Sequence, residues 1–490
     1  MSFYKNPINA KDGTSIPIFF NDKPMFSKYN PSRDVEVFSN HFAELKEKTA
    51  VFVTGIGNGL HLSKLLENEN ISMIFALEYN SESLDFCKNY LQNSSKFIFC
   101  TLENLQQQIL ENYIPQLHGN FVYQGYKAWI LAAAEYDANF SEKQIQDSIL
   151  DTLKSVSRDI ATQSYFGKIW HKNILQNVYS FYLAQKSELL AIPEDFDTTK
   201  TLAIIGASPN LENQIEELKK HREDFYVIST DTAFPVLLQN EIIPNAVATL
   251  DGQSVSTRHF MQKIPENCLL IADFCSNPSI IKKFLQNKGK IAFTNTGHPL
   301  SSLFDFWLCE KTHKKSIYNV SAGNGTVLQL ALDFGFSVGF SKYRLFGADF
   351  AYTQNKPYTK GTYFDFQFNS KGTKINSTEN LYSELMYKGK LIVENSVITT
   401  ENLKSYKEYL EKYLEIRQFS QNQDVKLQNQ FLPKDFFQWY LKNLLNDEKN
   451  AKKTLLPLLA WINNYNKNSD NYNEAICFTK KVLQSYLTEE

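Results

Sequence analysis

The chain has 490 residues, with 51 basic and 53 acidic side chains and a formal net charge of −2. Because no excess positive charge is available to bind a phosphate backbone, nucleic acid is excluded as an expected partner. The six cysteines include no C-x-x-C pair, which is typical of a reduced cytoplasmic protein rather than of a disulfide framework or a zinc site. No uncharged apolar run approaches the roughly 20 residues that a membrane helix needs, so we expect no integral membrane segment and a cytoplasmic location.

Over residues 49–123, short β-rich runs alternate with helical stretches, which predicts a parallel sheet built from βαβ units. The runs read AVFVTGIG, ISMIFALEY and SKFIFC. Glu78 ends the second run, and the glycines after the first are Gly55, Gly57 and Gly59. Read alone, this pattern resembles the cofactor loop of S-adenosylmethionine methyltransferases. Any tight turn between a strand and a helix also favours glycine, so a cofactor site and a purely structural turn both stay open.

Residues 141–190 are predicted to form long helices, because ILDTLKSVSRDIA and WHKNILQNVYSFYLAQ repeat apolar residues at helical spacing. The segment IPEDFDTTK at 192–200 then indicates a boundary. A second series of β-rich runs follows, from TLAIIG to YRLFGADF, and beyond about Asn376 the composition is that of helices. We therefore predict an α/β protein with two Rossmann-like parallel-sheet domains and a C-terminal helical region, divided as 1–190, 191–385 and 386–490.

Polar residues follow the strands of the second series, and ligands of open α/β sheets bind at the carboxyl ends of the strands. After TLAIIG, a tight turn opens a helix near Leu211, whose N-terminus is suited to a phosphate. The residues of this turn are Gly206, Ala207, Ser208, Pro209 and Asn210. Asp231 follows FYVIST and suits a ribose contact, and Asp251 ends AVATLD. Each aspartate could instead cap the helix after it.

A second loop of small residues precedes a helix that is apolar on one face from Val327 to Phe334. The loop contains Ser321, Ala322, Gly323, Asn324, Gly325 and Thr326. The predicted pocket thus has two walls rich in backbone N–H groups. Asp349 follows the last strand, with Tyr352 and Tyr358 on the loop beyond it. Tyrosine hydroxyls can donate to a phosphate oxygen, although most of the 26 tyrosines are expected to serve packing.

Taken together, these motifs resemble the motility-associated factor (Maf) glycosyltransferases. The resemblance is carried by GASPNL, STDTA, TLD, GNGTV and DFAYT, where the family reads G-x-G-P-S-L, G-G-S-V-A and D-L-A-Y or D-F-S-Y. FSKYNPSRD, GIGNGLHL and NILQNV match the earlier part of the family. The resemblance therefore covers most of residues 20–385, while the C-terminal helices match only in character.

The resemblance implies transfer of a nonulosonic acid, pseudaminic or legionaminic, from a CMP-activated donor to serine or threonine of flagellin. The central domain is also similar to bacterial sialyltransferases. By that similarity Gly206, Ser208, Pro209, Asn210 and Asp231 would line the nucleotide site, and residues 323–326 would form the facing wall. Tyr358, in KPYTKGT, would stabilise the departing phosphate, and Tyr352 is the second candidate.

The sequence departs from the family pattern at several positions. Ala207 stands where the family has a second glycine, and Asn210 stands where it has serine. The sialyltransferases use a histidine beyond the tyrosine loop as general base, whereas every histidine here lies at or before His313. Asp349, on the edge of the last strand, and His298, in TNTGHPLSS, are therefore the two candidates for the base.

Divalent cations in sugar-nucleotide transferases are commonly held by a D-x-D pair. The pair formed by Asp195 and Asp197 precedes the first strand of the second series, so we interpret it as part of the boundary. We predict a site without a metal, in which N–H groups and tyrosines do the work of the cation.

Two other interpretations stay open. The central domain also resembles the archaeal 6-hydroxymethylpterin diphosphokinases, which transfer pyrophosphate from ATP, and there Asp231, Asp251 and Asp349 would bind Mg²⁺. A non-catalytic flagellin-binding protein is the third possibility. In that case the amphipathic C-terminal helices would bind flagellin instead of only packing on the central domain.

Overall fold

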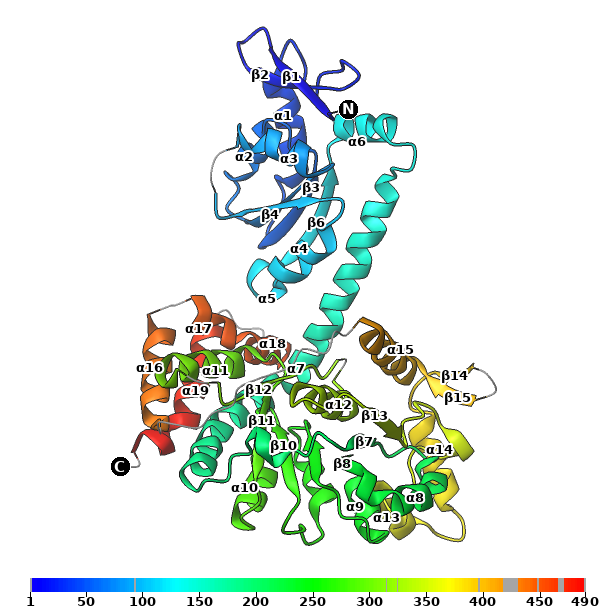
Figure 1. The fold of residues 1–490 in the computed structure, drawn as a ribbon. Helices are drawn as coiled ribbons and strands as arrows, with labels where there is room; N and C mark the ends of the chain where they lie inside the picture. Colours follow the sequence, from blue (N-terminus) through cyan, green and yellow to red (C-terminus); the bar gives the residue numbers. More distant parts are fainter. Residues whose placement is uncertain are drawn as a thin grey trace. The chain divides into compact units, whose positions relative to one another are not determined.

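A computed structural model describes residues 2–91, 94–313, 315–323, 325–394, 397–416, 431–446, 449–465 and 471–488 (Figure 1). The chain forms two compact units, Met1–Thr162 and Gln163–Glu490. The predicted division into three domains at residues 190 and 385 stays a prediction. Within the described residues, no helix combines the length and the apolar character needed to cross a bilayer.

The first unit is built around a parallel sheet of order β5-β4-β3-β6. Its strands are β3 (Thr49–Thr54), β4 (Ile71–Glu78), β5 (Phe97–Thr101) and β6 (Asn120–Gly125). The connecting elements are α1 (Pro31–Ser39), η1 (Asn40–Phe42), α2 (Leu60–Leu65), α3 (Ser81–Lys88), α4 (Leu105–Asn112), α5 (Pro115–His118) and α6 (Lys127–Tyr136). An antiparallel hairpin of β1 (Tyr4–Asn9) and β2 (Ser15–Phe19) packs its aromatic side chains into the same core.

One helix of 45 residues, α7 (Glu142–Lys186), contains both of the helical runs predicted from the sequence. The helix continues through Gly167, where a Cβ would overlap the carbonyl group of Pro457. Glycine at this position therefore allows the backbones of α7 and a C-terminal helix to come into direct contact.

The second unit contains a seven-stranded parallel sheet of order β12-β11-β10-β9-β8-β7-β13, as predicted for the second series. Its strands are β7 (Thr201–Ile205), β8 (Phe225–Thr230), β9 (Ala246–Thr249), β10 (Leu269–Asp273), β11 (Ile291–Asn295), β12 (Tyr318–Asn319) and β13 (Tyr343–Phe346). Because β7 lies between β8 and the last strand, the chain order reverses beside β7, which is where such sheets bind ligands.

Both faces of this sheet are covered, as is expected of a parallel sheet (Figure 1). Leu202 and Ile204 pack on the side of α12 (Val327–Ser337), while Ala203 and Ile205 pack on the side of α8. The helices and short turns on the second side and at the strand ends are η2 (Pro193–Asp195), α8 (Leu211–Lys220), η3 (Arg222–Asp224), α9 (Phe234–Gln239), η4 (Ser254–Phe260), α10 (Pro278–Gln286) and α11 (Pro299–Thr312).

The region after the sheet contains η5 (Thr353–Asn355), α13 (Tyr363–Lys371), α14 (Thr378–Met386), α15 (Glu401–Ile416), α16 (Pro433–Leu445), α17 (Lys449–Thr454), α18 (Leu456–Tyr465) and α19 (Asn471–Thr488). It also contains an antiparallel pair, β14 (Leu391–Glu394) and β15 (Val397–Thr400), although the composition predicted helices alone. The difference arises because LIV and VITT are rich in β-branched residues. Buried side chains of α16, α18 and α19 share one hydrophobic core with α7, α10 and α11.

Two asparagines of α7 hold the loops after β9 and β10 in place. The Asn173 amide donates to the carbonyl oxygens of Gly252 and Cys275, at 3.0 Å each. The Asn177 amide donates to the carbonyl oxygens of Phe274 (2.9 Å) and Ser276 (2.8 Å). The NILQNV motif thus fixes the loops that follow β9 and β10 at the carboxyl edge of the sheet.

Candidate functional site

The turn after β7 is built on two glycines in direct contact. Gly206 N–H donates to the Phe346 carbonyl (2.8 Å), and Ser208 N–H donates to the Gly347 carbonyl (3.0 Å). A Cβ on Gly206 would overlap the Gly347 oxygen, and a Cβ on Gly347 would overlap the Gly206 oxygen. Both residues must therefore be glycine for the ends of β7 and β13 to meet. Ala207 is not among the residues with positive φ, so alanine fits at that position.

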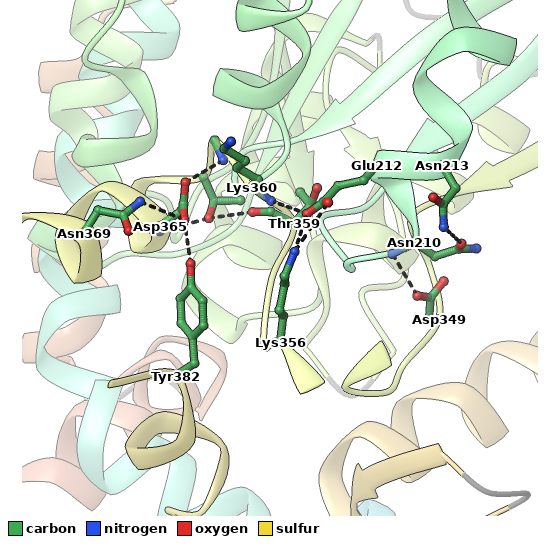
Figure 2. Close-up of polar contacts among 12 residues, drawn as sticks. Asn210, Glu212, Asn213, Asp349, Lys356, Thr359, Lys360, Asp365, Asn369 and Tyr382 are labelled. Atoms are coloured by element: carbon green, nitrogen blue, oxygen red, sulfur yellow. Dashed lines mark hydrogen bonds and ion pairs between the residues drawn. The ribbon is translucent and has the colours of Figure 1, made fainter. Parts of the chain in front are cut away.

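Asp349 places its carboxylate at the N-terminus of α8. Its Oδ2 accepts hydrogen bonds from Asn210 N–H (3.3 Å) and from the Thr353 hydroxyl (2.6 Å), and its own N–H donates to Ser208 Oγ (3.3 Å). Figure 2 shows Asp349 beside Asn210, whose side chain accepts from Asn213 (3.1 Å) instead of capping the helix. A negative charge is favoured at this end of a helix. The anion at the start of α8 is thus a side chain of the protein.

The loop that carries Tyr358 is tied to the glycine turn and to α8. Thr359 N–H donates to the Ala207 carbonyl (3.0 Å). The Glu212 carboxylate accepts from Lys360 N–H (3.0 Å) and pairs with the Lys356 ammonium (3.3 Å), as Figure 2 shows. These contacts hold both ends of the short segment around Tyr358 against the turn.

Beyond this segment, the buried Asp365 closes the loop. Its carboxylate accepts from Gly361 N–H (3.0 Å), the Asn369 amide (3.1 Å) and the Tyr382 hydroxyl (2.5 Å) (Figure 2). With these donors the carboxylate is fully engaged, so we interpret Asp365 as a structural residue.

Tyr358 is a hydrogen-bond donor at neutral pH. Its ring stacks on Phe364, with 4.7 Å between centroids and 7° between planes. Burial, followed by the nearby Tyr352 and the Asp231 carboxylate, raises the pKa of Tyr358 to about 12, so the phenol keeps its proton. Tyr352 lies nearby, where its N–H donates to the Ile398 carbonyl of β15 (2.8 Å) and burial raises the pKa of its hydroxyl.

Asp231 and Asp251 follow the neighbouring strands β8 and β9. Asp231 is 4% exposed and accepts from Thr232 N–H (2.7 Å) and the Thr249 hydroxyl (2.9 Å). Burial, reinforced by the Asp231 charge and opposed by a hydrogen bond from Gln253 N–H (2.8 Å), raises the pKa of Asp251. Neither carboxylate caps a helix, because the N-cap residues of α9 and η4 are Ala233 and Gln253, and neither helix has a side-chain cap.

The sequence analysis did not identify Asp273, which ends β10. It is completely buried, and burial raises the pKa of its carboxyl. The carboxylate accepts from Cys275 N–H (2.8 Å) and Thr296 N–H (3.0 Å). Asp273 therefore links the loops after β10 and β11. The available signal was the repetition of a terminal aspartate after successive β-rich runs.

The second small-residue loop is held by the helix that it opens. Ser321 N–H donates to Asp333 of α12 (2.6 Å), and Thr326 caps the helix by accepting from Gln329 N–H (3.2 Å). Gly325 N–H donates to the Ala322 carbonyl (2.9 Å). Burial raises the pKa of Asp333 to about 6. Asn324, predicted to belong to this wall, lies outside the described residues.

The first turn of α12 brings the two loops together. Leu328 Cδ1 lies 3.0 Å from the position that a Cβ on Gly206 would take, and Leu202 packs in the same way against Gly335 further along α12. The helix therefore runs along β7 and begins at the glycine turn. The structure thus gathers the turn at 206–210, Asp231, Asp251, Asp349, both loop tyrosines and the described loop residues 321–323 and 325–326 at one part of the sheet edge.

Tyrosines of α15 form a further wall that the sequence analysis missed. Tyr409 packs its ring on Gly323 and lies 3.5 Å from the Ser321 hydroxyl, and the Tyr413 hydroxyl donates to Asp333. Tyr406 lies near enough to Tyr358 to affect its pKa. The spacing of Tyr406, Tyr409 and Tyr413 places them on one face of a helix, which was the available signal.

Two buried histidines, His298 and His259, lie in the connections that follow β11 and β9. His298 follows β11 and is 8% exposed. It caps α11 by accepting a hydrogen bond from Leu300 N–H (3.1 Å). Burial lowers the pKa of its imidazole to about 3. His259, which sequence analysis did not single out, lies in η4 with ring centroids 6.0 Å from Phe364, and its buried Nδ1 has no partner among the described residues. His259 is also close enough to Asp251 to affect the pKa of that carboxyl.

The D-x-D pair serves the chain segment before β7. Asp195 accepts from Ile192 N–H (2.9 Å) and pairs with Lys290, while Asp197 accepts from Thr199. Within the part of the chain that the structure describes, no three His, Cys, Asp or Glu side chains are grouped as a metal site would require.

The glycine turn of the first unit is filled by the protein itself. A Cβ on Gly55 would lie 2.5 Å from Trp129 Cβ, and Gly57 packs on Met25. Glu78 is completely buried, and its carboxylate accepts from the Tyr4 hydroxyl (2.8 Å), Ile56 N–H (2.7 Å), Gly57 N–H (3.1 Å) and Trp129 Nε1 (3.0 Å). Glu78, the acidic residue of the pattern that resembles a cofactor loop, therefore holds the turn together.

Comparison with known proteins gives a match to a family model and matches to individual proteins. Residues 172–355, less than half of the chain, match the family model described as 6-hydroxymethylpterin diphosphokinase MptE-like. An uncharacterized protein of Treponema pallidum (strain Nichols) is 30% identical over 165 residues, which are 33% of this chain and 73% of that protein. A second one from the same organism is 25% identical over 232 residues, 46% of this chain and 79% of that protein.

Among solved structures, the Maf glycosyltransferase from Magnetospirillum magneticum AMB-1 matches with a TM-score of 0.50 and 13% sequence identity. The match covers 99% of this chain and 87% of that chain. At this identity it shows a common fold. The resemblances predicted from the sequence, to Maf glycosyltransferases and to MptE-like proteins, are thus confirmed, the first at the level of the fold and the second by the family model.

Proposed function

Because this chain belongs to the same family as the first Treponema pallidum protein and has the fold of a Maf glycosyltransferase, we propose that it is a glycosyltransferase. The proposed donor is a CMP-activated nonulosonic acid, pseudaminic or legionaminic. The proposed acceptors are serine and threonine hydroxyls of flagellin, modified in the cytoplasm as a step in flagellar assembly and motility. The donor and the acceptor rest on the sequence motifs.

The observation that carries the proposal is the packing of the first turn of α12 on the turn after β7. Leu328, in the first turn of α12, touches Gly206, so the turn after β7 and the loop before α12 flank one site. Asp231 lies close enough to Tyr358 to contribute to the raised pKa of the Tyr358 hydroxyl. Asp349 occupies the N-terminus of α8, so the helix N-terminus that supports a nucleotide here is that of α12, together with the close backbone approach at the turn and the hydroxyl donors.

The proposed reaction breaks the bond between the sugar and the phosphate of CMP while the acceptor oxygen bonds to the same sugar carbon. The departing phosphate gains negative charge in the transition state. Tyr358 is protonated and partly buried, so its hydroxyl is suited to donate a hydrogen bond to that charge. Tyr352 is the second donor. We propose that these hydroxyls and backbone N–H groups act without a metal ion.

Three side chains are candidates for accepting the proton of the acceptor hydroxyl. Asp349 and His298 are those predicted from the sequence, and His298 has the additional task of capping α11. His259 is the third, because it lies beside Asp251 and the aromatic ring on which Tyr358 stacks. The rate should lose its low-pH limb only in the variant that removes the base, among Asp349→Asn, His298→Gln and His259→Gln.

A second candidate function is favoured by the match of residues 172–355 to the MptE-like family model. In that case the protein transfers pyrophosphate from ATP, and Asp231, Asp251 and Asp349 bind Mg²⁺. Against this alternative, both Asp231 oxygens already accept hydrogen bonds, from Thr232 and Thr249.

Calorimetric titration of the full chain separates the candidates. CMP binding that persists in EDTA supports the glycosyltransferase, and binding of ATP only with Mg²⁺ supports pyrophosphate transfer. Binding of neither, together with binding of flagellin, indicates a non-catalytic flagellin-binding protein. Intact-mass spectrometry of flagellin from cells with and without the gene then tests the acceptor, because loss of the enzyme should remove a mass of one or more nonulosonic acid residues.

A further inference from the structure

The side-chain amide of Gln329 is buried beside the proposed site and lacks hydrogen-bond partners among the described residues. Gln329 lies in the first turn of α12 and is 2% exposed. Both Nε2 and Oε1 are buried without a hydrogen-bond partner among the described residues. A buried amide without partners is unfavourable, and nearly all buried polar groups of folded proteins are paired. An apolar residue of the same size would avoid this cost, so the amide requires an explanation.

The Gln329 side chain lies against the small-residue loop. Its Cγ is 3.2 Å from the position that a Cβ on Gly323 would take. Its own N–H donates to Thr326, which fixes the start of the helix, and the preceding residue, Leu328, touches Gly206. The unpaired amide therefore lies in the first turn of α12, between the loop that precedes this helix and the residue that packs on Gly206.

A side chain from another helix covers the same glycine. Ring atoms of Tyr409 lie 2.6 Å and 2.7 Å from the Gly323 Cβ position. Tyr409 is 37% exposed, and its hydroxyl lies 3.5 Å from the Ser321 hydroxyl, at the limit for a hydrogen bond. Its ring can therefore rotate away from Gly323 at little cost, which would open the loop above Gln329.

We propose that Gln329 reads the base of the bound nucleotide; this inference rests on the proposed function. A carboxamide offers one donor and one acceptor side by side in a plane. A phosphate has only acceptors and would leave Oε1 unpaired, whereas the edge of a nucleobase has a donor next to an acceptor and pairs with both atoms. For cytosine these are the 4-amino group and ring N3.

The test uses the full chain and the variants Gln329→Met and Leu330→Met. Met has nearly the volume of Gln without its polar atoms, and Leu330, buried on the same helix, controls for repacking of α12. The affinity for CMP is measured by calorimetry, and the thermal midpoint of the free protein is measured by calorimetric unfolding. We expect Gln329→Met to weaken CMP binding at least tenfold, with an unchanged or higher midpoint. Leu330→Met should bind as the wild type does.

Displacement of CMP by ribose 5-phosphate assigns the affected part of the ligand. Ribose 5-phosphate has no base, so its affinity should be equal in the wild type and in Gln329→Met. If ribose 5-phosphate does not displace CMP from either protein, the affinity for CMP also depends on the base. The inference is overturned if Gln329→Met binds CMP within about twofold of the wild type, or if its midpoint falls by several degrees. Failure of the wild type to bind any nucleotide would instead overturn the proposed function.

Discussion

Substitution of Gly206 by alanine tests the packing on which the site depends. The new Cβ would overlap the Gly347 carbonyl oxygen and would lie 3.0 Å from Leu328 Cδ1. The leucine can rotate, but the carbonyl belongs to the backbone directly after β13, so the ends of β7 and β13 would have to part by about 1 Å to restore normal contact. Overpacking of this kind costs about 1–3 kcal/mol. The same shift would separate the turn from the start of α12.

Differential scanning calorimetry and CMP titration of Gly206→Ala measure both effects. We expect a fall of several degrees in the midpoint of the second unit and a loss of CMP affinity of at least tenfold. Gly389→Ala is the matched control, because a Cβ there meets only Thr400 Cγ2, at 3.9 Å, and should leave both quantities unchanged. Wild-type stability and affinity in Gly206→Ala would refute the argument from close approach.

Three further changes test separate parts of the structure. Tyr358→Phe should lower kcat about 100-fold while CMP affinity stays within about twofold, because the hydroxyl acts on charge that develops during the reaction; equal losses in both would contradict that role. Because the pKa of Asp333 is raised to about 6, its protonation stabilises the fold below about pH 4, and this stabilisation is lost as the pH rises through 6. The midpoint of thermal unfolding should therefore fall between pH 4 and pH 7 in the wild type and should change less over this range in Asp333→Asn. Glu78→Gln should destabilise the first unit by about 2–4 kcal/mol in chemical denaturation and leave CMP affinity unchanged; altered CMP binding would give the first unit a functional role.

The sheet strands were predictable because each is a short apolar run ended by glycine or a polar residue. Fully buried parallel strands such as Leu202–Ile205 carry no polar alternation, which makes TLAIIG and LLIADF easy to recognise. The single long helix α7 was not predictable from its two amphipathic runs. Its continuity through Gly167 depends on packing against Pro457, nearly 300 residues later in the chain.

The site was predictable where function follows a strand end and unpredictable where it depends on contacts across the chain. Gly206, Asp231 and Asp349 could be assigned to one edge because parallel strands end together. By contrast, Tyr409 reaches Gly323 from a helix that looked like ordinary amphipathic packing. Likewise, Gln329 is recognisable only by the absence of partners in the folded chain. A sequence pattern shows the periodicity of an element, whereas the Tyr409 contact and the unpaired Gln329 amide arise only from tertiary packing.

The first strand of the large sheet, β7, pairs with the last, β13, so this part of the sheet completes its folding late in synthesis. Since β13 and the residues directly after it supply the Phe346 and Gly347 carbonyls and the Asp349 carboxylate, the turn at Gly206 lacks these hydrogen bonds until residue 349 has left the ribosome and docked. A nascent chain that stops short of β13 exposes the edge of β7 and lacks the backbone contacts that fix the turn at Gly206. The candidate site therefore forms late in synthesis, and the exposed β7 edge is a point at which premature termination promotes aggregation.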